Sequence, residues 1–298
     1  VAPIICVPTT AGTGSEVTIG AVISDHDTHH KYAITAPCVT PKAAILDPEL
    51  TVSMPPFITA TTGVDALTHA VESYVTCMYN TDKTNNVEDA VVSIFWYLER
   101  AYNAPNDMEA REQMLYASCT AGLAFTCTGV GYVHGIAHAL GGLYNTAHGL
   151  ANSVILPIVL EDYGTAVYPK LARLAELTEI QTSGTEAEKA RAFIAAIRAL
   201  IDVGFPISFA LACAAAGICC IGAALFDQEQ EERDRQQNKN SAHHQQDLNG
   251  AKYTELYQKY RQAYNIDAIL QGVWDKDVLT QAPVSYTHLR AHETLANL

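Results

Sequence analysis

The hydrophobic period of this chain changes at Pro55, and that change limits what the chain can fold into. Before Pro55 the apolar residues form short β-prone runs, and after it they recur with the period of an α-helix. The early runs predict strands at residues 4–7, 20–24, 31–35 and 43–46. Because four short strands cannot make a stable domain alone, we expect residues 1–50 to be the end of a larger α/β domain.

Helical segments with short connections follow. We place them at residues 56–77, 86–103, 108–128, 131–143, 148–163, 165–179 and 185–203. The last segment has a capping box formed by Thr185 and Glu188, and Gly204 followed by Pro206 predicts its end. Short connections favour antiparallel helix packing, so we predict an all-helical domain at residues 51–206.

The chain beyond this domain has no fold that we can assign over residues 207–283. Residues 205–226 carry no charged side chain and are long enough to span a membrane, but their many Ala and Gly residues favour a buried helix. Residues 227–249 have almost nothing to bury and are predicted to be disordered. The segment from Val284 resembles the translation of a sequencing adapter, so we expect residues 284–298 to be an artefact.

Charge and cysteine content narrow the class of protein. The formal net charge of −14 argues against a nucleic-acid partner, because a phosphate-binding surface must be basic. The eight cysteines form no C-x-x-C pair and no disulfide pattern, so we expect buried thiols in a reducing, cytoplasmic compartment, without membrane association. The chain opens on Val1 rather than an initiator methionine, and we expect its start to be missing.

Asp65 and His69 form the first candidate functional pair. They are four residues apart in a predicted helix, so both side chains lie on one face. A carboxylate and an imidazole so placed can bind one divalent cation together. An incidental pair on a solvated helix face is the alternative, and the pair alone does not decide between them.

Three histidines, His134, His138 and His148, lie within fifteen residues of an apolar stretch rich in Gly and Ala. Buried imidazoles need partners, and small neighbours let helices pack closely around a compact site. The spacing is not H-E-x-x-H, so a zinc protease would lack its general base. Core histidines bonded to backbone carbonyls are the alternative, but their position beside a D-x-x-x-H helix favours a metal site.

Two segments together resemble a known family. Residues 63–72, G-V-D-A-L-T-H-A-V-E, and residues 134–152, H-G-I-A-H-A-L-G-G-L-Y-N-T-A-H-G-L-A-N, resemble both signatures of the iron-containing (group III) alcohol dehydrogenases. Residues 8–16, P-T-T-A-G-T-G-S-E, resemble that family's cofactor loop, and the likeness runs from about residue 1 to about 206. It implies an incomplete iron-containing alcohol dehydrogenase (dehydroquinate synthase-like) fold, with an α/β remnant followed by an all-α helical domain. Residues 1–50 would then be the C-terminal part of the dinucleotide-binding domain, and residues 51–206 the metal-binding domain.

The resemblance also implies roles for single residues. The implied metal ligands are Asp65, His69, His134 and His148. His138 corresponds to a non-ligand histidine near the nicotinamide, which makes it a candidate proton relay. The implied cofactor contacts are Thr9, Thr10, Thr13 and Lys31. A Gly/Thr turn after a strand offers N–H groups and hydroxyls to a diphosphate, although many such turns are only turns, and Lys31 could be an ordinary strand-end lysine. Glu16, Glu72 and the cysteines are interpreted as structural.

The implied reaction is hydride transfer between a primary alcohol or aldehyde and NAD or NADP, with a divalent metal polarising the substrate oxygen. The family uses Fe²⁺, and one Asp with three His also suits Zn²⁺ or Mn²⁺. A non-catalytic metal-binding fragment, a maleylacetate reductase and a glycerol dehydrogenase are the alternatives. We expect a homodimer or larger homo-oligomer for the complete protein. The family's Gly-Gly-Ser phosphate loop is not found in this chain, and no likeness is recognised beyond Pro206.

Overall fold

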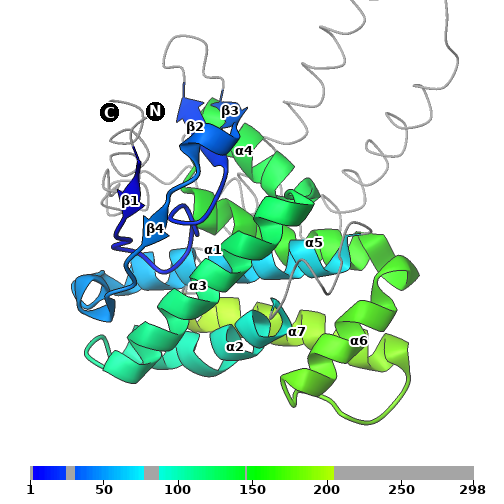
Figure 1. Ribbon diagram of the computed structural model, residues 1–298. Helices are drawn as coiled ribbons and strands as arrows, with labels where there is room; N and C mark the ends of the chain where they lie inside the picture. The colour runs from blue at the N-terminus through cyan, green and yellow to red at the C-terminus, as the bar shows by residue number, and fades with distance from the viewer. Residues whose placement is uncertain (1–2, 25–30, 77–86, 145, 205–298) are drawn as a thin grey trace, which may run out of the picture.

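The computed structural model describes residues 3–24, 31–76, 87–144 and 146–204. The predictions for residues 205–226, 227–249 and 284–298 lie outside these ranges. The described chain begins with a small strand region, which lies beside a larger group of helices (Figure 1). This order agrees with the predicted α/β remnant followed by helices.

The strand region contains two separate pairs. The bounds are β1 (Ile5–Cys6), β2 (Gly20–Ser24), β3 (Lys31–Thr35) and β4 (Ala43–Ala44). β1 pairs in parallel with β4, and β2 pairs antiparallel with β3. The predicted strands at 20–24 and 31–35 are confirmed, whereas those at 4–7 and 43–46 are shorter than predicted, because β1 and β4 pair over only two residues each. Two 3-10 turns, η1 (Pro37–Val39) and η2 (Pro48–Thr51), complete this part.

The described helices follow the predicted order closely. Their bounds are α1 (Pro56–Val75), α2 (Val87–Asn103), α3 (Met108–Thr128), α4 (Tyr132–Tyr144), α5 (His148–Tyr163), α6 (Tyr168–Leu177) and α7 (Glu186–Gly204). The prediction of one helix over 165–179 was wrong, because a 3-10 turn, η3 (Gly164–Ala166), precedes α6. Pro169 in the first turn of α6 has no N–H to continue a preceding helix, so a new helix starts there.

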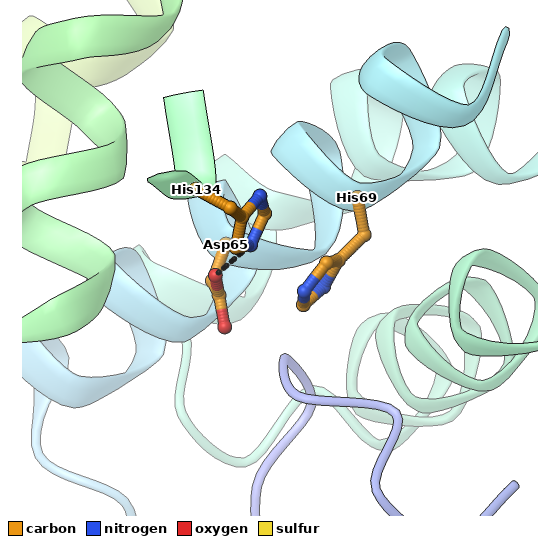
Figure 2. Close-up of side chains that lie close together, drawn as sticks. All are labelled: Asp65, His69 and His134. Carbon is orange, nitrogen blue, oxygen red and sulfur yellow. Dashed lines mark ion pairs between the residues drawn. The ribbon is translucent and has the colours of Figure 1, made fainter. Parts of the chain in front are cut away.

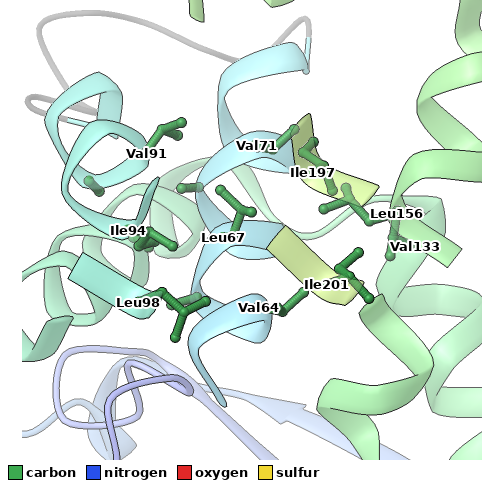
Figure 3. Close-up of a cluster of buried hydrophobic side chains, with 14 of the residues drawn as sticks. Val64, Leu67, Val71, Val91, Ile94, Leu98, Val133, Leu156, Ile197 and Ile201 are labelled. Carbon is green, nitrogen blue, oxygen red and sulfur yellow. The ribbon is translucent and has the colours of Figure 1, made fainter. Parts of the chain in front are cut away.

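Helix α1 is the centre of the helical part. All of its residues from Thr59 to Tyr74 are buried, and it packs against α2, α3, α5 and α7. Its apolar side chains Val64, Leu67 and Val71 contact a shell of aliphatic residues from the surrounding helices (Figure 3). That shell includes Val91, Ile94, Leu98, Val133, Leu156, Ile197 and Ile201. Polar side chains on α1 are therefore buried by helices on every side.

Helix ends are fixed by the side chains that the sequence places there. Thr185 and Glu188 form the predicted capping box: the Thr185 N–H donates to Glu188 Oε2 at 2.8 Å, and the Glu188 N–H donates to Thr185 Oγ1 at 3.3 Å. Asp107 caps α3 by accepting a hydrogen bond from the Ala110 N–H at 3.0 Å. Helix α7 is described as far as Gly204, and the predicted stop at Gly204 and Pro206 falls where the described residues end.

The Thr/Gly loop after β1 runs between α1 and α3. A Cβ on Gly12 would lie 2.5 Å from Thr62 Cβ, and one on Gly14 would lie 2.7 Å from the Cα of Gly122. Gly14 also has a φ of +59°, a backbone conformation that favours glycine. Close backbone packing thus requires these glycines, whatever the loop binds.

The expectation of buried thiols was wrong in the described ranges. Cys38 and Cys127 are exposed, Cys6 and Cys119 are partly buried, and all four are free. Cys38 lies in the short turn η1, and Cys127 lies in the last turn of α3, where neighbouring helices no longer cover the side chain. Within the same ranges, no helix is long and apolar enough to cross a membrane.

Candidate metal centre

Side chains from α1 and α4 converge in the middle of the helical part. Asp65 and His69 lie one turn apart on α1, and His134 reaches them from α4 (Figure 2). One nitrogen or oxygen atom from each lies within 4.8 Å of the others, and all three residues are buried. His134 Nε2 is 3.5 Å from Asp65 Oδ1.

His148, at the start of α5, lies at the edge of this group. Its Nε2 is 3.4 Å from the same oxygen, Asp65 Oδ1. Its side chain is 21% exposed, whereas that of Asp65 is 1% exposed. The structure therefore brings all four sequence-predicted ligands together, with His148 on the side that solvent reaches.

Glu72 sets the orientation of His134. Its Oε2 lies 2.6 Å from His134 Nδ1, and its Oε1 accepts a hydrogen bond from the Val133 N–H at 2.8 Å. With Nδ1 held by the Glu72 carboxylate, the ring is fixed so that Nε2 of His134 faces Asp65. Sequence reasoning interpreted Glu72 as structural, yet its spacing of seven from Asp65 and three from His69 places it on the same helix face.

The Thr/Gly loop orients His69 in the same way. His69 Nδ1 lies 3.3 Å from the carbonyl oxygen of Gly12, so an Nδ1–H donor leaves Nε2 for the centre. The ring is stacked between Phe125, with a centroid distance of 4.3 Å, and His134, at 4.4 Å. The predicted cofactor loop and the predicted metal site are thus in direct contact.

Asn152 is a second residue that sequence reasoning missed. It lies one turn after His148 on α5 and is fully buried. Its Nδ2 donates to Asp65 Oδ1 at 2.7 Å and lies 3.2 Å from Nε2 of both His134 and His148. The spacing H-x-x-x-N, which repeats the i, i+4 logic of Asp65 and His69, is the sequence signal that could have found it.

The protonation of the group follows from its burial and its charges. Burial by itself raises the pKa of Asp65, but His69, His148 and hydrogen bonds from the histidines hold that pKa well below its usual value. Burial lowers the pKa of His69 to about 3. For His134, burial favours the neutral ring, but hydrogen bonds to Asp65 and Glu72 outweigh it and raise the pKa to about 9. Asp65 is thus ionised and His69 neutral, as metal ligands must be, while His134 must release a proton to bind a cation.

The residues present fit a divalent cation. Asp65 Oδ2 is buried and, within the described chain, has no hydrogen-bond partner. A buried carboxylate oxygen in that position is costly unless a cation or donor meets it. One carboxylate and three imidazoles are a donor set suited to Fe²⁺, Zn²⁺ or Mn²⁺.

His138 lies beside the four candidate ligands. It follows His134 by one turn of α4 and is partly exposed. Its ring centroid is 5.1 Å from that of His148 and 6.2 Å from that of His134. It therefore lies between the buried group and the more open side of the site.

The predicted cofactor contacts are only partly described. Thr9 is exposed, and Thr10 and Thr13 are partly buried. Thr13 Oγ1 donates to Ser15 Oγ at 3.1 Å and accepts from the Ser15 N–H at 3.3 Å, so its hydroxyl stabilises the turn itself. Lys31 begins β3, and its side chain lies outside what the structure describes.

With the site established, comparison with known proteins identifies the family. The model of the C-terminal part of the Fe-containing alcohol dehydrogenase family matches residues 59–212, and the iron-containing alcohol dehydrogenase model matches residues 1–48. The chain belongs to the iron-containing alcohol dehydrogenase family. The C-terminal match includes all four candidate ligands and extends past Pro206, where the sequence resemblance was expected to end.

Individual members of the iron-containing alcohol dehydrogenase family resemble the chain over most of its described length. The 1,3-propanediol dehydrogenase of Klebsiella pneumoniae is 43% identical over 209 residues, which cover 68% of this chain and 53% of that protein. The NAD-dependent methanol dehydrogenase of Bacillus methanolicus is 41% identical over 212 residues, covering 70% and 56%. A crystal structure of 1,3-propanediol oxidoreductase matches with a TM-score of 0.66 and 39% identity, covering 72% of this chain and 59% of that one.

These matches confirm the recognised family and the predicted iron-containing alcohol dehydrogenase fold. The chain spans about half the length of the two curated relatives, 53% and 56%. The fold of the family is therefore present here in part, as the sequence predicted. The strand region and the helices correspond to the two parts that the family models describe.

Proposed function

We propose that this chain provides the metal centre and part of the nicotinamide site of an alcohol dehydrogenase. The enzyme transfers hydride between a primary alcohol or aldehyde and NAD or NADP. The observation that carries the proposal is the buried convergence of Asp65, His69 and His134, with His148 at its edge. Relatives named NAD-dependent methanol dehydrogenase and NADPH-dependent butanol dehydrogenase support the reaction class. Because one is named for NAD and the other for NADPH, we propose either nucleotide as the cofactor.

The ligands we propose are Asp65, His69, His134 and His148, and Fe²⁺ is the metal, with Zn²⁺ and Mn²⁺ suited to the same donors. A bound divalent metal supplies a Lewis acid that polarises the substrate oxygen and lowers the pKa of an alcohol. The chain's own contribution is to keep this region dry, because Asp65 and His134 are each 1% exposed. Low exposure strengthens every electrostatic contact made there.

His138 is the residue we propose to carry protons between the site and solvent. It is partly exposed and adjoins His148, the most exposed of the proposed ligands. An imidazole can accept and donate a proton near neutral pH, as an alcohol-to-aldehyde conversion requires. Thr9, Thr10, Thr13 and Lys31 remain the proposed cofactor contacts, and their loop adjoins the site through the Gly12 carbonyl.

The test compares the metal content and activity of the purified chain with those of two histidine variants. The chain is expected to retain about one Fe²⁺ or Zn²⁺ per protomer, and an intact version of the protein is expected to oxidise a primary alcohol with NAD⁺ or NADP⁺. His148→Ala should lose metal and activity together, whereas His138→Ala should keep the metal and lose turnover by about a hundredfold.

Two results would contradict this assignment. If His138→Ala released the metal and His148→Ala did not, the proposed ligand set would be wrong. If an intact version held metal without any alcohol-dependent nicotinamide reduction, the non-catalytic metal-binding alternative would replace the enzyme. Metal content is measured by elemental analysis, and hydride transfer by nicotinamide absorbance.

A further inference from the structure

Asn152 is the polar side chain that touches most of the proposed ligands. Its Nδ2 lies 2.7 Å from Asp65 Oδ1 and 3.2 Å from Nε2 of His134 and of His148. An amide nitrogen carries two hydrogens, so it cannot satisfy all three neighbours at once. The shortest contact, which is to a charged acceptor, is the strongest of them.

The orientation of this amide follows from the same contact. If the amide were reversed, its carbonyl oxygen would lie 2.7 Å from the carboxylate of Asp65, and two acceptors would repel each other. The observed orientation leaves Asn152 Oδ1 buried and, in the described part of the chain, without a hydrogen-bond partner. An unpaired buried oxygen is costly, so the hydrogen bond to Asp65 must outweigh that cost. This bond is therefore the contact that fixes the orientation of the Asn152 amide.

The bond from Asn152 divides the two oxygens of Asp65 between different tasks. Oδ1 accepts the amide hydrogen, whereas Oδ2 is buried and has no hydrogen-bond partner among the described residues. Oδ2 is therefore the oxygen that keeps its lone pairs for a cation. A carboxylate held through one oxygen binds a metal through the other, in one defined orientation.

The other two contacts of Asn152 are to the histidine nitrogens that would bind the metal. Nε2 of His134 and Nε2 of His148 are the atoms that face the centre, and both are within 3.2 Å of Nδ2. An imidazole has one lone pair at Nε2, so it can meet either an amide hydrogen or a metal, but not both. After the hydrogen bond to Asp65 the amide has one hydrogen left, so it can donate to only one of the two rings at a time, until a metal takes up the ring lone pairs.

We propose that Asn152 is a positioning residue that directs Oδ2 of Asp65 to the metal and, with its second hydrogen, holds the ring of either His134 or His148 in place before the metal binds. This inference rests on the proposed metal site. It adds Asn152 to the site as a residue that orients the metal ligands but does not bind the metal itself. It also explains why a fully buried amide follows His148 by one helical turn.

The experiment measures Co²⁺ and Zn²⁺ binding to the full chain by competition with a chromophoric chelator, for wild type and Asn152→Ala. Asn152→Leu is measured alongside. It nearly keeps the side-chain volume and is expected to fold, but it lacks the amide N–H donor. Ser153→Ala is the matched control: Ser153 is the next residue on α5 and equally buried, but its hydroxyl donates to the Leu150 carbonyl at 2.7 Å, away from the ligands.

Removing the donor should weaken metal binding by about ten- to a hundredfold, while Ser153→Ala should leave the affinity unchanged. The visible spectrum of bound Co²⁺ should also change, because Asp65 is then able to bind through both oxygens and the coordination number rises. A change in helix stability alone would not alter that spectrum.

Three other outcomes would contradict either the proposed metal site or the role of Asn152. If wild type binds neither cation, the proposed metal site is wrong. If wild type binds and the Asn152 variants keep its affinity and its Co²⁺ spectrum, only the role of Asn152 is overturned. Loss of fold in both Asn152 variants, with Ser153→Ala folded, would assign Asn152 to folding and would also overturn the proposal.

Discussion

A close approach between α5 and α1, at Gly149, predicts what a single methyl group would do to this protein. Gly149, the second residue of α5, lies against the backbone of Thr61, and a Cβ there would be 2.2 Å from the Thr61 carbonyl oxygen. Ordinary contact begins at 3.4 Å, so Gly149→Ala requires a displacement of about 1.2 Å between the two helices. No side-chain rotation relieves the overlap, because the atoms it meets are backbone.

That displacement should lower both the free energy of unfolding and the metal affinity. Overpacking costs about 1–3 kcal/mol, and a backbone clash belongs to the upper part of that range. The better helix propensity of alanine offsets up to about 1 kcal/mol, which leaves a net loss of about 2 kcal/mol in the free energy of unfolding. The same movement lengthens the 2.7 Å contact between Asn152 and Asp65 beyond hydrogen-bond range, so metal affinity should fall at least about tenfold.

The assay is denaturant unfolding of the metal-free chain, followed by chelator competition for Zn²⁺. Gly135→Ala is the matched control, because Gly135 also follows a proposed ligand histidine, yet a Cβ there meets no atom of the described chain within 4 Å. That variant should be more stable than wild type by about 0.5–1 kcal/mol, with unchanged metal affinity. If Gly149→Ala matched Gly135→Ala in both measurements, helix proximity at residue 149 would not determine the site.

Two further predictions concern carboxylates. Glu72→Gln removes the charge and leaves one acceptor oxygen where the Val133 N–H and His134 Nδ1 need two, so Zn²⁺ affinity should fall by about ten- to a hundredfold, and an unchanged affinity in chelator competition would contradict the orienting role. The hydrogen bond from the Ala110 N–H, and then Arg100, lower the pKa of Asp107. Its contribution to stability is present above its unfolded pKa of about 4 and is lost as pH falls through its lower folded pKa, so thermal unfolding of Asp107→Asn should depend less on acid than that of wild type.

The order and type of the elements could be predicted from the sequence because they depend on local patterns. The bounds of α3 and α5 agree with prediction, and the capping box of Thr185 and Glu188 forms as expected. The failure at residues 165–179 is also local: the hydrophobic period continues across η3, while Pro169 starts a new helix. The hydrophobic period alone cannot show that the α-helix begins only at Tyr168, after the 3-10 turn.

The candidate ligands could be predicted because each motif is short and repeats a helical spacing. Asp65 and His69 lie on one face of any helix that contains them, and the order of the motifs along the chain resembled a family. What orients these ligands is not local. Glu72 reaches His134 across 62 residues of sequence, and Asn152 reaches Asp65 across 87.

The sequence by itself determined the strands and helices, the family and the four proposed ligands, because helical period and motif spacing are properties of neighbouring residues. Only the tertiary structure decided that α1 is buried on all sides, that His148 is the most exposed of the four, and that Asn152 donates to Oδ1 of Asp65 while Oδ2 has no hydrogen-bond partner in the described chain. These features arise where three helices meet. Their physical cause is the packing distance between backbones, as at Gly149, together with hydrogen bonds between residues far apart in the chain.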